Sequence, residues 1–127
     1  MKREIIQLEE ANSVAPVSPA VRVGDLIFVS GQVGFDNHNK CYYGDDIETQ
    51  ARGAMENLKE VLEASGSDMD HLVKVSIYLT DINDFPVVNG IYKEYIHEPY
   101  PARICYGIAD IFIGGLVEIE AVAVTGD

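Results

Sequence analysis

The chain has 127 residues, so we expect a single domain over residues 1–127. Hydrophobic residues make up 47% and charged residues 24%, a balance that excludes a disordered tail, a collagen-like chain and a coiled coil. The formal net charge of −12 argues against tight binding to nucleic acid or to an anionic membrane surface.

The sequence carries no pattern of a secreted, membrane-spanning or zinc-bound protein. Its first residues turn polar too soon for a signal peptide, and no run approaches the ~20 apolar residues of a membrane span. The cysteines, Cys41 and Cys105, are too few for a disulfide framework, and the histidines lack metal-ligand spacing. We therefore expect a soluble cytoplasmic protein without a metal site.

In the first half of the chain, the apolar pattern predicts three strands, over residues 4–8, 20–23 and 26–30. The Gly24-Asp25 pair between the last two is typical of a type II′ hairpin turn. Prolines predict a loop over residues 11–19, and polar residues predict another over 36–46.

The clearest helix pattern runs from Asp45 to Ser65, where apolar residues recur at the spacing of one helical face. Asp45 with Glu48 resembles a capping box at its start. Gly66 stands where a glycine often ends a helix.

The second half predicts a strand over 72–80, a helix over 85–96, and strands over 103–110 and 116–125. Asn83 or Asp84 would cap this helix. The order β-β-β-α-β-α-β-β favours an α+β fold in which both helices cover one sheet face. The other face, with Tyr78 and Tyr106 as candidates on it, would stay open and favour self-association. The alternative is a monomer with scattered surface aromatics.

Arg103 is one of nine cationic residues and begins a predicted strand. Its guanidinium is a planar fork that matches a carboxylate, so Arg103 could clamp a small acid. The alternative is a structural ion pair with one of the 21 acidic residues.

Four further positions near the predicted strands could take part in binding or catalysis. Glu118 and Glu120 fall on one strand face, where either could position a water or both could lie at a solvated edge. Cys105 points to the same side as Arg103 and is either a reactive thiol or a small buried residue. The amides around Gly31 could bind an anion or simply end a strand.

Six parts of the chain, taken in order, form a recognisable pattern: Val23–Gln32, Glu56–Gly66, Val73–Asp81, Phe85 with Val88-Asn89 and Tyr92, Pro101–Arg103 and Val117–Ala121. This pattern resembles the reactive intermediate imine deaminase family, known as RidA, YjgF or L-PSP endoribonuclease. Together they cover most of the chain, and the specificity of the resemblance lies in finding all of them in order at family spacing.

The resemblance implies a chorismate-mutase-like fold, a mixed sheet of about six strands with two helices on one face. It also implies a homotrimer formed through the other sheet face, with active clefts between subunits. Without a cofactor, these clefts would hydrolyse reactive enamine and imine acids, such as 2-aminoacrylate and 2-aminocrotonate, to 2-keto acids and ammonia.

The same resemblance implies roles for individual residues. Arg103 would bind the substrate carboxylate and Glu120 would position the attacking water, so both are expected to be catalytic. Five more positions would line the cleft: Ser30, Gly31, Asn89, Cys105 and Val17. Val17 departs from the pattern, because deaminating members carry a tyrosine there. The loop Ile111–Gly115 departs too, since it lacks the family lysine and gains an aromatic ring.

Two other functions stay open at this point. A trimer could bind small carboxylates such as 2-ketobutyrate without catalysis, which the loss of the tyrosine at Val17 would favour. Some family members carry an endoribonuclease or translation-inhibitor activity, but the −12 charge and the lack of a base-stacking motif argue against it.

Overall fold

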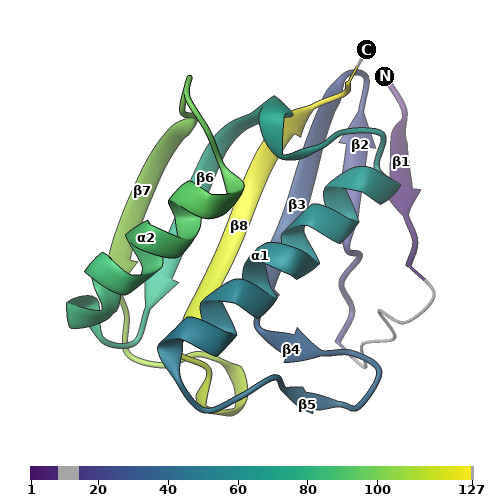
Figure 1. Cartoon of the computed structure of the whole chain (residues 1–127). Coiled ribbons are helices and arrows are strands. Elements are labelled where there is room, and N and C mark those ends of the chain that lie inside the picture. The colour runs from purple at the N-terminus through teal and green to yellow at the C-terminus, as the bar shows by residue number, and fades with distance from the viewer. Residues whose placement is uncertain (9–14, 127) are drawn as a thin grey trace.

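A mixed β-sheet and two helices form from the described residues, 1–8 and 15–126, of the computed structural model (Figure 1). The strands of the main sheet are β1 (Arg3–Ile6), β2 (Ala20–Val23), β3 (Leu26–Val33), β6 (Leu72–Leu79), β7 (Ala102–Gly107) and β8 (Val117–Val124). The helices are α1 (Ile47–Ala64) and α2 (Phe85–Tyr95), and the 3-10 turns are η1 (Met69–His71), η2 (Ile82–Asp84) and η3 (Phe112–Gly114). A separate ribbon pairs β4 (Phe35–Asp36) with β5 (Cys41–Tyr42).

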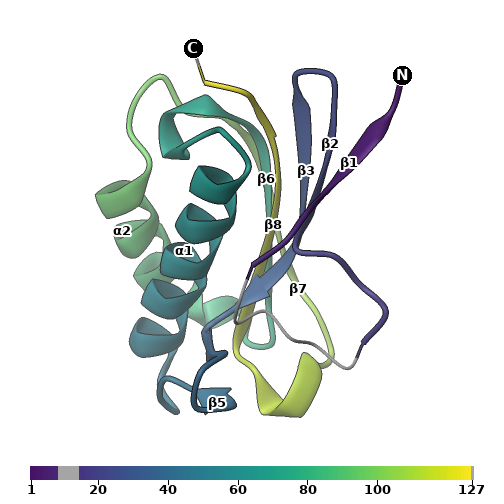
Figure 2. The ribbon, with the colours of Figure 1, turned by 90° about the vertical axis from the view of Figure 1, so that its right-hand side faces the viewer.

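The main sheet has the strand order β1-β2-β3-β8-β6-β7, in which β6 and β7 run parallel and the other pairs antiparallel. Figure 2 shows both helices on one side of the sheet, which confirms the predicted α+β fold. Alternate strand residues face the helices, and Ile27, Ile77 and Ile119 there are fully buried. On the other face Phe28 and Tyr106 are 46% and 58% exposed.

The predicted turn and helix signals are confirmed to within a residue. Gly24 has φ of +60° while Asp25 has no positive φ, as a type II′ turn requires. Helix α1 is capped by Asp46, one residue after the predicted Asp45, because the Asp46 carboxylate accepts from the Thr49 backbone N–H at 2.9 Å. Gly66 follows the helix at φ +82°.

Other boundaries differ from the predictions. The stretch 36–46 is not only a loop, since it contains β5 and the end of β4. The first strand lies at Arg3–Ile6, and the last two strands are shorter than predicted. Asp84 occupies the N-cap of α2 but makes no capping bond; Asp81 instead accepts from the Asn83 N–H and caps the preceding turn. Residues 11–14 of the predicted loop 11–19 lie outside the described residues.

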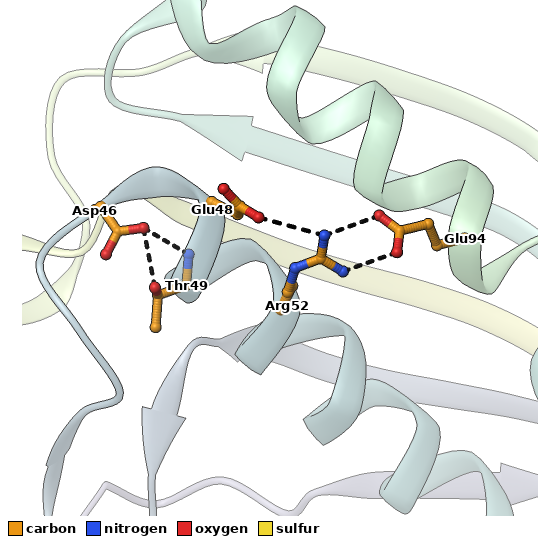
Figure 3. A network of polar contacts seen from close by, with 5 residues as sticks. All are labelled: Asp46, Glu48, Thr49, Arg52 and Glu94. Atoms are coloured by element: carbon orange, nitrogen blue, oxygen red, sulfur yellow. Dashed lines mark hydrogen bonds and ion pairs between the residues drawn. The ribbon is translucent and has the colours of Figure 1, made fainter.

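An arginine on α1 ties the two helices together (Figure 3). The Arg52 guanidinium donates to both carboxylate oxygens of Glu94 on α2, at 3.0 and 2.9 Å, and to Glu48 at 3.4 Å. A two-bond contact of this kind fixes orientation as well as distance. It therefore helps to position α2, the helix that carries the aromatic side chains described below. In the described residues, no helix has the length and apolar character needed to cross a bilayer.

Candidate active site

Arg103 lies near the start of β7 with its guanidinium over two aromatic rings of α2. The guanidinium carbon Cζ is 4.8 Å from the ring centre of Tyr92 and 5.5 Å from that of Phe85. In the parallel pair of β6 and β7, Arg103 stands opposite Val75, which is fully buried, so Arg103 faces the helices. Cation–π attraction to both rings holds the charged head of Arg103 on this side of the sheet.

Arg103 is also unpaired within residues 1–8 and 15–126, where no carboxylate lies within ion-pair distance of its guanidinium. The structural ion pair considered from the sequence is therefore not found in the described part of a chain with 21 acidic residues. A guanidinium has five N–H donors, and contacts with ring faces take up none of them in a hydrogen bond to oxygen. Arg103 is thus available to an anionic ligand.

Asn89 and Cys105 lie around the same arginine. Asn89 is four residues after Phe85 and three before Tyr92, which places all three on one face of α2. Cys105 lies two residues beyond Arg103 on the same side of β7. Burial raises the pKa of the Cys105 thiol, against a smaller lowering by the charge of Arg103, so this thiol is a poor nucleophile. We call these five residues the arginine half-site.

Ser30 and Gly31 form a bulge in the sheet. The register of β3 against β8 shifts between Val29 and Gln32, so the two bulged residues stand opposite Glu120 alone. The strand predicted to end at residue 30 therefore continues through residue 33. A bulge re-aims side chains, and bulges are common beside functional sites.

The segment that carries Val17 is fastened to this bulge. The Ser30 hydroxyl donates to the Ser18 carbonyl at 2.6 Å, and the Ser30 N–H donates to the Pro19 carbonyl at 3.0 Å. The Val17 side chain is 62% exposed. The segment that carries Val17 therefore lies beside Ser30 and Gly31.

Glu118 packs directly against the bulge. A Cβ at Gly31 would collide with the Glu118 carboxylate, so the glycine is what leaves room for it. Burial, and then the charge of Glu120, raise the pKa of Glu118. A carboxyl group whose pKa is raised toward neutrality is suited to exchange protons with a reacting molecule.

Glu120 is held differently. The Tyr78 hydroxyl on β6 donates to Glu120 Oε1 at 2.5 Å, and this bond is the largest cause of a raised pKa of Tyr78. Among the described residues, none donates a hydrogen bond to the Glu118 carboxylate. We call Ser30, Gly31, Tyr78, Glu118 and Glu120 the carboxylate half-site.

The two half-sites lie on opposite faces of one sheet. Glu120 is paired with Ser76, the residue after Val75, and alternate residues of a strand point to opposite faces. Arg103 shares the helix-covered face with Val75, whereas Glu120 lies on the uncovered face with Tyr78. A single copy of the chain therefore does not bring Arg103 and the carboxylates to one cleft.

Comparison with known proteins identifies the family. The family model described as Endoribonuclease L-PSP matches residues 8–125. The 2-iminobutanoate/2-iminopropanoate deaminase of Bos taurus is 41% identical over 125 residues, which cover 98% of this chain and 91% of that protein. The human protein of the same name is 38% identical over 126 residues, 99% of this chain and 92% of that protein.

The chain belongs to the L-PSP, or RidA, family.

Solved RidA-family structures share its fold. A putative endoribonuclease L-PSP from Entamoeba histolytica superposes with a TM-score of 0.91 at 38% identity, covering 97% of this chain and 99% of that one. TdcF of E. coli, solved with bound serine, superposes with a TM-score of 0.88 at 31% identity, with the same coverage of both chains.

One loop of this RidA-family chain, the turn η3, is strained. Ile113 has φ of +49° and ψ of +43°, a left-handed conformation that β-branched residues rarely adopt. The Tyr42 hydroxyl donates to the Phe112 carbonyl and braces the loop. The charge of Glu118 adds to burial in raising the pKa of Tyr42, which places the brace near the carboxylate half-site. The side chains of Phe112 and Ile113 are both 68% exposed.

Sequence reasoning missed three features of the RidA-family site. It left the role of Glu118 open, gave Tyr78 no partner, and did not connect Phe85 and Tyr92 with Arg103. The i, i+4, i+7 spacing of Phe85, Asn89 and Tyr92 was the one available signal for the aromatic pair. Within the described residues, no three His, Cys, Asp or Glu side chains gather as metal ligands would.

Proposed function

We propose that this RidA-family protein hydrolyses small 2-imino acids to 2-keto acids and ammonia. The observation that carries the proposal is the half-buried guanidinium of Arg103, which stacks on two rings and has no ion-pair partner in residues 1–8 and 15–126. The curated relatives named as imine deaminases support it. The acid end of the substrate would lie on Arg103 as a bidentate carboxylate.

The reacting end needs a positioned water rather than a strong nucleophile, because an imine carbon is already electrophilic. The water oxygen bonds to this carbon while the C=N π electrons move to nitrogen, which takes up a proton. The resulting carbinolamine then collapses: its hydroxyl proton is lost, the C=O bond forms, and the C–N bond breaks to release ammonia. A carboxylate beside the carbon would accept the proton of the water and return it to the leaving nitrogen.

Two carboxylates are available for this proton transfer. Glu120 was predicted for the role, but one of its oxygens accepts from Tyr78. Glu118 packs against Gly31 and has a raised pKa, so its position favours Glu118 for proton transfer. The charge of Glu120 contributes by raising the pKa of Glu118. Val17, Ser30, Asn89 and Cys105 would line the cleft around the substrate.

The cleft is proposed to form between copies of the chain in a homotrimer. Arg103 and the carboxylates lie on opposite faces of the sheet, which supports this arrangement. One copy would supply the arginine half-site and its neighbour would supply the carboxylate half-site. The uncovered sheet face, with exposed Phe28 and Tyr106, supplies apolar surface for the association.

A coupled assay tests the function. A serine/threonine dehydratase releases 2-aminoacrylate or 2-aminocrotonate, and keto-acid formation is timed with and without the protein. We expect acceleration, its loss in Arg103→Ala, and no change in Arg22→Ala, the matched control, whose guanidinium donates to its neighbour Gly24. Absence of acceleration by a folded protein would reject the deaminase.

The carboxylate assignment is tested by a matched pair, Glu118→Gln and Glu120→Gln. Loss of one positioned acid or base lowers kcat by about 10²–10⁴-fold, which we expect for Glu118→Gln. Glu120→Gln should retain most of kcat. The reverse order would return the role to Glu120.

The shared cleft is tested by mixing inactive variants. Arg103→Ala and Glu118→Gln chains are unfolded together and refolded, and activity is compared with that of each variant refolded alone. Mixed assemblies should regain activity, because a cleft built from the intact half of each chain is complete. Failure to regain activity in mixed assemblies would place both residues in one copy's site.

A second candidate function is a receptor for small carboxylates that performs no chemistry. Arg103, which has no ion-pair partner in the described part of the chain, would be enough to bind the carboxylate, and the valine at position 17 favours this function. Saturable, Arg103-dependent binding of 2-ketobutanoate by a protein that accelerates no imine hydrolysis would establish the receptor instead of the enzyme.

A further inference from the structure

The Tyr92 hydroxyl stands out among the buried polar groups. Of the buried side-chain nitrogen and oxygen atoms that the structure describes, it alone has no hydrogen-bond partner. The residue is only 5% exposed. A buried hydroxyl without a partner is destabilising, so phenylalanine would be the more stable choice at this position.

The hydroxyl belongs to a ring that already contacts the anion receptor. The guanidinium of Arg103 lies over this ring, with Cζ 4.8 Å from its centre, and Phe85 lies at 5.5 Å. Burial raises the pKa of Tyr92, and the charge of Arg103 opposes that rise, so the hydroxyl is within electrostatic reach of the guanidinium. A buried donor without a partner is therefore next to a cation that has no ion-pair partner among the described residues.

The Arg103 guanidinium and the Tyr92 hydroxyl could both donate hydrogen bonds to one carboxylate. An ionised carboxylate can accept several hydrogen bonds on its two oxygens, more than a bidentate arginine supplies. One such anion would satisfy the N–H groups of Arg103 and the O–H of Tyr92 together. No other group described beside the arginine explains why a hydroxyl is kept in this position.

We propose that Phe85 and Tyr92 form an aromatic cradle that orients Arg103, and that the Tyr92 hydroxyl donates a second hydrogen bond to the carboxylate of the bound acid. Phe85 is a positioning residue, since it acts through Arg103. Tyr92 orients Arg103 through its ring and contacts the acid through its hydroxyl. The proposal rests on the small-acid site of the proposed function but not on turnover.

Direct binding of 2-ketobutanoate to the whole protein tests this, by calorimetry or NMR titration. A hydrogen bond to a charged group contributes ~1.5–3 kcal/mol, so Tyr92→Phe should raise Kd by tenfold or more. Phe85→Leu removes one ring of the cradle and should raise Kd about two- to tenfold. The control Tyr43→Phe removes an exposed hydroxyl from the segment before α1, outside both half-sites, and should leave Kd unchanged.

A second readout separates this role from a merely structural one. Without ligand, Tyr92→Phe should be as stable as wild type or more stable, because the unpartnered hydroxyl is gone. With saturating 2-ketobutanoate, its rise in melting temperature should be smaller than that of wild type. A structural role predicts lower stability without ligand and an unchanged rise.

The outcomes distinguish this inference from the proposed function. If wild type binds 2-ketobutanoate and Tyr92→Phe binds it equally well, the hydroxyl has another partner, such as a water, and its assigned role is wrong. Unchanged binding by Phe85→Leu would remove Phe85 from the cradle. Tyr92-dependent binding without any imine hydrolysis would reject the enzyme and leave this inference standing.

Discussion

Tyr78 donates a 2.5 Å hydrogen bond to Glu120, while Glu118, two residues earlier on the same strand face, receives none from the described residues. The two carboxylates therefore differ in their hydrogen bonding, although both are glutamates on the same face of β8. Glu120 is fixed by a neighbouring strand, and Glu118 abuts the bulge at Gly31. This difference in environment supports the proposal that Glu118, rather than Glu120, exchanges the proton.

Removing the Tyr78 hydroxyl should lower the stability of the fold more than it lowers kcat. Tyr78→Phe should lower the free energy of unfolding by about 1 kcal/mol, the usual net value of one hydrogen bond. Urea unfolding measures this, with Tyr106→Phe as the control on the same sheet face. A loss of kcat as large as that of Glu118→Gln would contradict the fixed role of Glu120.

The raised pKa of Glu118 predicts how stability depends on pH. Because the native carboxyl holds its proton more tightly than the unfolded one, its contribution is present below the ordinary pKa of 4.5 and is lost as pH rises through the raised native pKa. Glu118→Gln carries no such proton. Its stability relative to wild type should therefore increase from about pH 4 to about pH 7.

Thermal unfolding of both proteins at the two pH values measures this difference. The control is Glu63→Gln, which changes an exposed carboxylate on α1. A relative stability of Glu118→Gln that falls as pH rises would show that Glu118 is stabilised by its charge, contrary to its position against the bulge.

Relief of backbone strain at Ile113 should stabilise the protein. Glycine adopts the left-handed conformation without a Cβ clash, so Ile113→Gly should raise the free energy of unfolding by about 0.5–1 kcal/mol. Ile82 is also exposed but has no positive φ, and Ile82→Gly should lose stability instead. Chemical denaturation compares the two, and a destabilised Ile113→Gly would mean that the side chain makes contacts in the assembled protein.

Restoring the family tyrosine should raise turnover. Val17 is 62% exposed on a segment fastened to Ser30, so a larger ring can be placed there without repacking the core. One added hydrogen bond in the transition state would be worth about tenfold in kcat/KM for Val17→Tyr in the coupled assay. Val17→Phe supplies the ring without the hydroxyl, and equal gains for both variants would assign the effect to stacking.

The sequence was sufficient for the elements of the fold, because helix α1, the hairpin at Gly24 and the strands have strong local patterns. For Arg103 the local pattern left two readings open, a carboxylate clamp and a structural ion pair, and only the family resemblance favoured the clamp. The division of labour between Glu118 and Glu120 could not be predicted, because a period of two places both on one face. Two strands distant in sequence distinguish them: Tyr78 on β6 donates to Glu120, and the bulge on β3 packs against Glu118.

The placement of the two half-sites on opposite faces of the sheet could not be predicted from the sequence either. It depends on the parallel register that sets Arg103 opposite Val75, and register between β6 and β7 is fixed by packing across a helix rather than by local residues. The small ribbon of β4 and β5 was missed for a related reason. Its strands are two residues long, too short for any alternation to show.

The placement of the half-sites on opposite faces of one sheet has a genetic consequence if the clefts are shared as proposed. Each chain would then contribute to two neighbouring active sites, one through Arg103 and one through Glu118. A chain with both residues replaced would still fold and assemble, and would silence both sites that it touches. Such an allele should act dominantly over the normal one, reducing activity by more than its share of the protein.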